Sequence, residues 1–139
     1  MGVLASRGDE VVGIDSINNY YDVRLKYGRL SEMGVMLNDE FVWNQPIQSS
    51  RYETCRFIRM SIDDRHAMEE LFEREHFEKV VNLAAQAGVR YSITNPYAYL
   101  QSNLAGFLNV LECCRHYEVK HLVFASSSSV YGLNSKVPY

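Results

Sequence analysis

The stretch that decides the fold is GDEVVGIDSINNYYDVRLKYGRL, residues 8–30. Within it, residues 10–15 (EVVGID) are a short β-branched run ending in an acid, which predicts a strand covered on both faces. Residues 23–33 follow with a helical pattern that stops near Gly34. Alternation of this kind predicts parallel strands joined by helical crossovers.

Three further apolar runs predict strands: residues 55–62 (CRFIRMSI), 79–85 (KVVNLAA) and 120–126 (KHLVFAS). A helix is predicted after Asp63 and Asp64, because Met68, Leu71 and Phe72 share one helical face. Residues 94–117 predict a long helix with Pro96 in its first turn. Its apolar stripe comprises Leu100, Leu104, Phe107, Leu108 and Leu111. The predicted fold class is α/β, a doubly wound parallel sheet of the Rossmann-like kind.

The beginning of the chain predicts an incomplete sheet. Residues 3–8 resemble the last turn of a helix with Gly8 just past its end. In a dinucleotide-binding fold, a first strand and a glycine-rich turn precede that helix, and we expect both to be missing here. The missing strand would lie between the strands at 10–15 and 79–85, leaving two unpaired edges and a marginally stable or aggregating chain. Residues 38–54 predict no element.

Composition excludes several classes of protein. The chain has 139 residues, 47% hydrophobic and 22% charged, with a net charge of −3, which does not suit a nucleic-acid binder. No stretch approaches the roughly 18 apolar residues of a membrane span, and no secretory signal opens the chain. Three cysteines without a C-x-x-C favour reduced thiols in a cytoplasmic protein, and the four histidines lack the spacing of metal ligands.

Asp15 is the first candidate for chemistry, because it ends a predicted strand. In a dinucleotide-binding fold, an acid at this place accepts hydrogen bonds from the adenosine ribose and repels a 2′-phosphate, which favours NAD over NADP. The alternative is an ordinary acidic loop residue or helix cap.

Two more segments follow predicted strands. In NLAAQAGVR (82–90), small residues allow the backbone to approach a ligand closely, and Arg90 could bind an anion. The alternative is a small-residue turn under a helix, with Arg90 solvated. In FASSSSVYG (124–132), a serine at the carboxyl edge of the sheet could hydrogen-bond a substrate oxygen during hydride transfer. The alternative is a flexible serine-rich loop.

Taken together, residues 8–30, 80–92 (VVNLAAQAGVRYS), 95–115 (NPYAYLQSNLAGFLNVLECCR) and 124–134 (FASSSSVYGLN) resemble the extended short-chain dehydrogenase/reductase family. The resemblance covers nearly the whole chain and is greatest to the nucleotide-sugar epimerases, above all those acting on UDP-glucuronate. It implies that residues 1–139 are part of an NAD-binding domain, that the substrate domain is absent, and that the cofactor is NAD.

The same resemblance implies roles for individual residues. The implied cofactor contacts are Asp15 at the ribose, Asn18 and Asn19 in the adenosine loop, Ser61 and Ile62 near adenine, Leu83, Ala84 and Ala85 beside the pyrophosphate and nicotinamide ribose, and Ser126. Asn103 resembles a helix asparagine that ties the central strands together. Ser127 aligns with the catalytic Ser/Thr, and the implied substrate contacts are Arg90, Ser128 and Ser129.

In the reaction that the resemblance implies, Ser127 assists a tyrosine base that takes the sugar O4 proton while NAD⁺ takes the C4 hydride. The 4-keto sugar then turns over and receives hydride on its other face. Tyr131 is not that base, because no lysine follows at i+4. We expect the Y-x-x-x-K pair further along the family's sequence, so this chain should lack activity and bind NAD poorly.

Departures from the family pattern leave alternatives open. Ser61 stands where related enzymes often carry an acid that contacts the adenine amine. Related 4,6-dehydratases place an Asp-Glu pair after the catalytic Ser/Thr, whereas this chain has Ser128 and Ser129, which favours epimerisation over dehydration. A non-catalytic NAD-binding module is a third possibility. The expected partners are a UDP-sugar and, in the complete protein, a second copy through helices such as 94–117, but neither nucleic acid nor membrane.

Overall fold

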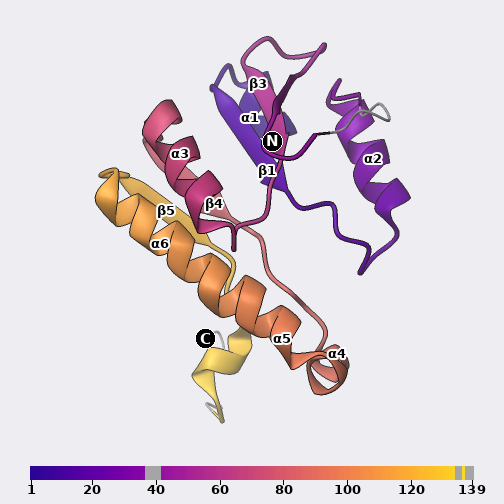
Figure 1. The fold of residues 1–139 in the computed structure, drawn as a ribbon, viewed down its shortest axis with the longest axis vertical. Helices are drawn as coiled ribbons and strands as arrows, with labels where there is room; N and C mark the ends of the chain where they lie inside the picture. The colour runs from indigo at the N-terminus through magenta and orange to yellow at the C-terminus, as the bar shows by residue number, and fades with distance from the viewer. Residues whose placement is uncertain (37–41, 134–135, 137–139) are drawn as a thin grey trace. The chain divides into compact units, whose positions relative to one another are not determined.

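The computed structural model describes residues 1–36, 42–133 and 136 (Figure 1). The chain divides into two compact units, Met1–Ala67 and Met68–Tyr139, and each is described by itself. Among the described residues, no helix is both long enough and apolar enough to cross a membrane.

The first unit contains a three-stranded sheet in the order β1-β3-β2. Strand β1 (Val11–Asp15) runs parallel to β3 (Cys55–Arg59), with Val11 opposite Cys55 and Asp15 opposite Arg59. Strand β2 (Pro46–Gln48) is antiparallel to β3. The strand at β1 is confirmed nearly to the residue. Strand β2 was not predicted, because its three residues carry no periodic apolar pattern.

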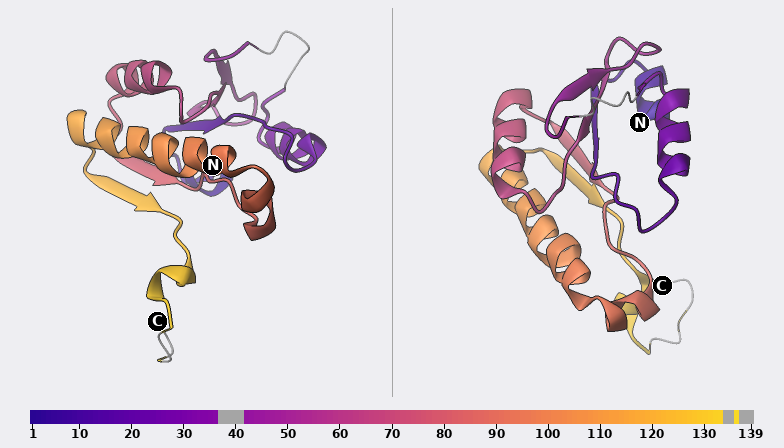
Figure 2. Two further views of the ribbon diagram at one scale, coloured as in Figure 1. Left: turned by 60° about the horizontal axis from the view of Figure 1, so that its bottom comes forward. Right: turned by 45° about the vertical axis from the view of Figure 1, so that its right-hand side comes forward.

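Helices α1 (Gly2–Ser6) and α2 (Val23–Glu32) lie on the same side of this sheet (Figure 2). Cys55 and Phe57 are two residues apart on β3 and therefore face the same way. Cys55 packs with Ala5 of α1, whereas Phe57 packs with Leu30 of α2. These buried contacts hold both helices against one face of the sheet.

Both predicted helix ends in this unit are confirmed. Gly8 has φ of +90° and donates its amide to the carbonyl of Ala5, as expected of a residue just past a helix. Gly34 has φ of +73°, and a Cβ placed on it would lie 2.6 Å from the amide nitrogen of Arg51. At the other end of α2, the Asp22 side chain accepts a hydrogen bond from the amide of Arg24 at 2.9 Å.

The second unit contains two parallel strands, β4 (Lys79–Asn82) and β5 (His121–Phe124). Between them run α4 (Val89–Thr94), α5 (Pro96–Tyr99), the π-helix η1 (Leu100–Gly106) and α6 (Phe107–His116). Helix α3 (Arg65–Glu75) precedes β4, and the 3-10 helix η2 (Ser128–Tyr131) follows β5. The Asp64 carboxylate accepts from the amide of Ala67, confirming the predicted start of α3.

Helix α6 covers one face of the β4–β5 pair (Figures 1 and 2). The rings of Phe107 on α6 and Phe124 on β5 lie 5.1 Å apart, which places Phe124 on the covered face. Val123 points the opposite way and stands beside its partner Val81, and both side chains are about half exposed. One apolar face of this pair is therefore uncovered within the described residues.

Three strand predictions are too long. Those at 55–62, 79–85 and 120–126 end in the structure at Arg59, Asn82 and Phe124. The apolar and small residues beyond them have no strand partner among the described residues, so the pattern alone overstated the strand length. The resulting loops carry most of the predicted site residues.

The predicted helix over 94–117 is also corrected. It is interrupted in its middle by a π-helical segment, since leucine spacing does not distinguish an α-turn from a π-turn. Its leucine stripe does lie on one side, but Leu104 and Leu108 are 63% and 57% exposed, whereas Val110 and Cys113 of the same helix are buried. The four leucines of the stripe therefore lie toward the outer face of the helix, whereas Phe107, the fifth member, packs against Phe124 of the sheet.

Each sheet has an edge strand that pairs on one side only. Within the described residues, β1 pairs with β3 alone and β4 pairs with β5 alone. Both strands therefore present backbone groups that no other described strand satisfies. This agrees with the two unpaired edges expected from the sequence.

Candidate functional site at the carboxyl ends of the parallel strands

Asp15 is the last residue of β1, at the carboxyl end of the first sheet. Its backbone carbonyl accepts the amide of Met60, which joins the ends of β1 and β3. Its side-chain Oδ1 accepts two hydrogen bonds, from the amide of Ile17 at 2.6 Å and from Lys26 Nζ at 2.9 Å. Oδ2 accepts none from the described part of the chain, and the side chain is 43% exposed. One carboxylate oxygen is thus held in place while the other is available to a ligand.

The loop after Asp15 turns sharply at Ile17, a buried residue with φ of +54°. Positive φ is unusual for a β-branched residue, and the hydrogen bond from the Ile17 amide to Asp15 accompanies it. The turn leaves Asn18 and Asn19 exposed directly after the carboxylate. Their predicted contact with an adenosine stays a prediction.

Ser61 and Ile62 follow β3 at the same edge of the sheet. The Ser61 hydroxyl donates to the carboxylate of Asp63, so this serine already has an acidic partner. Ile62 is 9% exposed and contributes its side chain to the interior of its unit. Any contact of Ile62 with a ligand would therefore come from its backbone.

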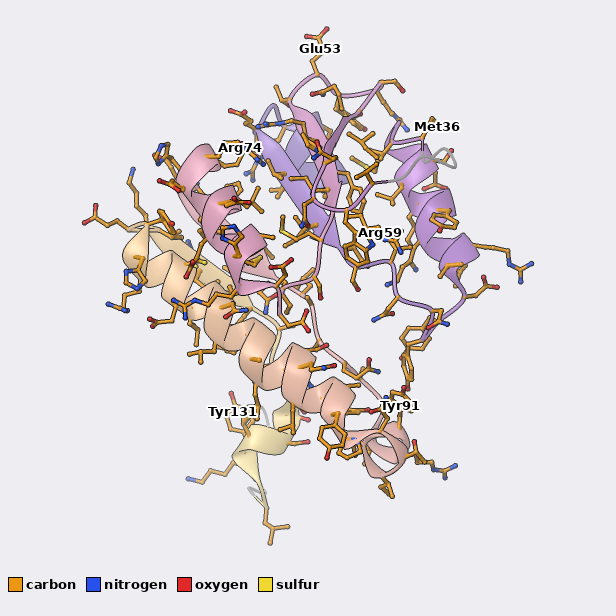
Figure 3. All side chains as sticks on the ribbon, in the orientation of Figure 1. Met36, Glu53, Arg59, Arg74, Tyr91 and Tyr131 are labelled. Atoms are coloured by element: carbon orange, nitrogen blue, oxygen red, sulfur yellow. The ribbon has the colours of Figure 1, made fainter. Side chains whose placement is uncertain are left out.

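Sequence reasoning missed two cations at this edge. Lys26 lies on α2, eleven residues after Asp15, and no local motif connects the two. Arg59 lies opposite Asp15 in the sheet, with its guanidinium 4.4 Å from the centre of the Trp43 ring and Nε 3.4 Å from the carbonyl oxygen of Ser16 (Figure 3). The predicted bounds do not give the Asp15–Arg59 register, because the first strand was predicted to begin one residue early and the second to end three residues late.

The carboxyl end of the second sheet carries the predicted small-residue wall. Leu83, Ala84 and Ala85 are exposed and follow β4 directly. The amide of Ala84 donates to Asn82 Oδ1 at 3.2 Å, which turns the chain away from the strand. Ala84 and Ala85 therefore present backbone and small side chains to solvent, which allows a ligand to approach closely, whereas the larger Leu83 side chain is 73% exposed beside them.

Asn103 holds this wall from the helix side. Its Oδ1 accepts the amide of Gln86 at 2.8 Å, and its Nδ2 donates to the carbonyl of Gln86 at 3.0 Å. Gln86 is 8% exposed, so both backbone groups are removed from water. Asn103 thus joins η1 to the loop after β4, whereas the family resemblance led us to expect a bond between central strands.

Ser127 leaves β5 at the same end as the wall, because Asn82 and Phe124 are strand partners and the amide of Ala125 donates to the carbonyl of Asn82. Its Oγ accepts the amide of Ser129 at 3.2 Å and lies 3.1 Å from the Ser129 hydroxyl. Ser127 is thus the N-cap of η2. Ser126 and Ser128 are exposed beside it.

Arg90 lies on α4, exposed, with no partner among the described residues. Tyr131, at the end of η2, is half exposed (Figure 3). Across the described residues there is no cluster of side chains that could hold a metal ion. Burial raises the pKa of the Cys55 and Cys114 thiols, so both favour the unreactive protonated form.

The predicted site residues fall into two groups. Asp15, Asn18, Asn19, Ser61 and Ile62 belong to the first unit, at the carboxyl end of β1 and β3. The second group lies in the second unit, around the carboxyl end of β4 and β5, and comprises Leu83, Ala84, Ala85, Arg90, Ser126, Ser127, Ser128 and Ser129. A groove shared by Asp15 and Ser127 stays a prediction.

Comparison with known families shows to which family the chain belongs. Residues 3–139 match the family model described as GDP-mannose 4,6 dehydratase. The chain belongs to the nucleotide-sugar epimerase/dehydratase family. Among curated relatives, UDP-glucuronate 4-epimerase 2 of Arabidopsis thaliana is 42% identical over 140 residues, covering 98% of this chain and 28% of the relative.

Solved structures agree with this membership and with the Rossmann-like fold. The UDP-glucose 4-epimerase of Thermotoga maritima, solved with UDP-glucose, is 28% identical with a TM-score of 0.68, covering 98% of this chain and 36% of that one. The enzyme of the same name from Thermus thermophilus, solved with NAD, is 28% identical with a TM-score of 0.63, covering 91% and 32%. The chain thus spans about a third of the length of the relatives it matches.

Proposed function

We propose that this chain supplies the adenosine-binding acid and the catalytic serine of an NAD-dependent UDP-glucuronate 4-epimerase. The main support is Asp15, whose Oδ1 is fixed by two donors while Oδ2 accepts no bond from the described residues. A carboxylate held in this way at the end of a parallel strand can accept hydrogen bonds from the two neighbouring hydroxyls of a ribose. The 42% identity to a UDP-glucuronate 4-epimerase over 98% of the chain supports the choice of sugar.

Each unit carries residues that would suit one part of an NAD molecule. In this proposal, Asp15 binds the adenosine ribose, Asn18 and Asn19 border it, and Ser61 and Ile62 approach the adenine. The wall of Leu83, Ala84 and Ala85 lies against the pyrophosphate and nicotinamide ribose, with Ser126 beside it. NAD, when bound, supplies a hydride acceptor and donor for C4 of the sugar.

Ser127 positions the proton that leaves the sugar O4. Its hydroxyl can donate to or accept from that oxygen, and its place at the carboxyl end of β5 is where such a group is needed. Arg90 binds an anionic group of the UDP-sugar, and Ser128 and Ser129 contact the substrate. The acceptor for the proton is a tyrosine other than Tyr131. The complete enzyme is a cytoplasmic homodimer.

A 4,6-dehydratase is the second candidate, because the matching family model carries that description. Loss of water from the sugar needs an acid and a base. In related dehydratases, the Asp-Glu pair after the catalytic Ser/Thr would supply both. Ser128 and Ser129 occupy those positions here, and neither hydroxyl titrates near neutral pH. This difference supports epimerisation.

The test uses the full-length gene product that carries this sequence, incubated with UDP-glucuronate and NAD. Chromatography of the products should show UDP-galacturonate, and Ser127→Ala should lower its rate by about 100-fold or more. Ser6→Ala, at an exposed serine of α1 to which the proposal gives no role, is the control and should have a much smaller effect. Formation of a 4-keto-6-deoxy sugar from a UDP-hexose, without UDP-galacturonate from UDP-glucuronate, would reject the proposal in favour of dehydration.

A further inference from the structure

The ion pair between Lys26 and Asp15 has a consequence for cofactor choice. Lys26 Nζ lies 2.9 Å from Asp15 Oδ1, and the lysine side chain is only 22% exposed. Among the described residues, Asp15 is its one hydrogen-bond partner. The ammonium is therefore held against the carboxylate and screened from water more than a surface lysine would be.

We propose that Lys26 sets how strongly this site discriminates against a 2′-phosphate on the adenosine ribose. The inference rests on the proposed function, in which Asp15 binds that ribose. A carboxylate alone repels a phosphate dianion, whereas an ammonium 2.9 Å away offsets part of the repulsion. With this pair, the carboxylate of Asp15 still favours NAD, but it lowers the affinity for NADP less than an unpaired carboxylate would.

A second cation lies at the same sheet edge. The Arg59 side chain reaches from the end of β3 to the carbonyl of Ser16, the residue directly after Asp15. Its guanidinium lies over the Trp43 ring, 4.4 Å from the ring centre. Asp15 is the ion-pair partner of Lys26, so removing its charge leaves Lys26 without this counter-ion beside the ribose.

This arrangement predicts a latent phosphate site. In an Asp15→Asn variant the amide keeps an oxygen that can accept from the Ile17 amide, so the turn is preserved. Lys26 then has no anionic partner among the described residues and can pair with a 2′-phosphate. The gain in NADP affinity should therefore depend on Lys26 and not only on the loss of the carboxylate.

The experiment measures the dissociation constants of NAD and NADP by calorimetry at low salt, using the full-length gene product. Asp15→Asn should bind NADP about tenfold more tightly than the wild type. Adding Lys26→Met to that variant should cancel the gain, whereas adding Lys26→Arg should keep it. Arg29→Met, an equal change of charge on the same helix at an exposed residue, is the control and should leave the NADP affinity of Asp15→Asn unchanged.

The outcomes separate the two claims. If the wild type binds NAD but Lys26→Met and Arg29→Met affect NADP binding to Asp15→Asn equally, the role of Lys26 is refuted and the proposed function stands. If the wild type binds no NAD, the proposed function fails and the inference fails with it. Loss of the NADP gain with Lys26→Met, together with its retention in Lys26→Arg, would support both.

Discussion

Substitution of Asn103 tests how the π-helix η1 holds the loop after β4 that carries Leu83, Ala84 and Ala85. Its side chain makes two hydrogen bonds to the backbone of Gln86, at 2.8 and 3.0 Å. Replacing it by alanine leaves one backbone donor and one acceptor without partners at a residue that is 8% exposed. Each unsatisfied group costs about 1–3 kcal/mol, so Asn103→Ala, which leaves two, should lower the free energy of unfolding by about 2–6 kcal/mol.

The assay is urea denaturation of the full-length gene product, followed by circular dichroism, with Gln101→Ala as the control. Gln101 is exposed on the same π-helix, and its substitution should change the free energy of unfolding by about 0.5 kcal/mol or less. The NAD affinity of Asn103→Ala should also fall, because the loop that carries Leu83 to Ala85 loses its anchor. Equal stabilities of the two variants would refute this account of Asn103.

An aspartate at this position gives an independent check of the geometry. Asn103→Asp keeps an acceptor for the Gln86 amide but directs a second oxygen at the Gln86 carbonyl. At neutral pH the variant should therefore be at least as unstable as Asn103→Ala. Acidification should restore part of its stability relative to the wild type, because a protonated carboxyl can donate to that carbonyl. Stability that is unaffected by acidification would show that Nδ2 is not the donor.

Three further predictions follow from other parts of the chain. The unpaired edges of β1 and β4 predict that the 139-residue chain self-associates in sedimentation velocity, and a monomer with one cooperative thermal transition would contradict this. The exposed leucine face predicts that Leu104→Glu converts a full-length dimer into monomers, with Gln101→Glu leaving the dimer intact; a persistent dimer would reject this face as the interface. Hydrogen bonding to Lys120 lowers the pKa of Glu78, so the pair stabilises the fold above the unfolded-state pKa and this contribution is lost as the pH falls through the folded-state value. Lys120→Gln should thus lower the melting temperature slightly at neutral pH and not in acid, and an equal loss at both would contradict the assignment.

Much of the fold could be predicted because its signals are local. The β-branched run before Asp15 and the glycines that end α1 and α2 act through their own backbone preferences and near neighbours. The carboxyl ends of parallel strands carry ligand sites for a topological reason, so Asp15 and the serine-rich segment after β5 could be named once the strands were recognised. The family resemblance was needed to single out Ser127 within that segment. The strand ends were wrong because an apolar residue beyond the last ladder partner has the same pattern as one within it.

The sequence by itself determined the order of β1, β3, β4 and β5, the helix stops at Gly8 and Gly34, and the acid that ends β1. Only the tertiary structure decided that Lys26 contacts Asp15, that Asn103 contacts Gln86, and that the leucine stripe faces outward. These features join residues 11 or more positions apart or depend on which helix face meets the sheet. These contacts depend on loop closure and on packing between different elements. Contacts between residues far apart in the sequence produce no periodic pattern from which they could be predicted.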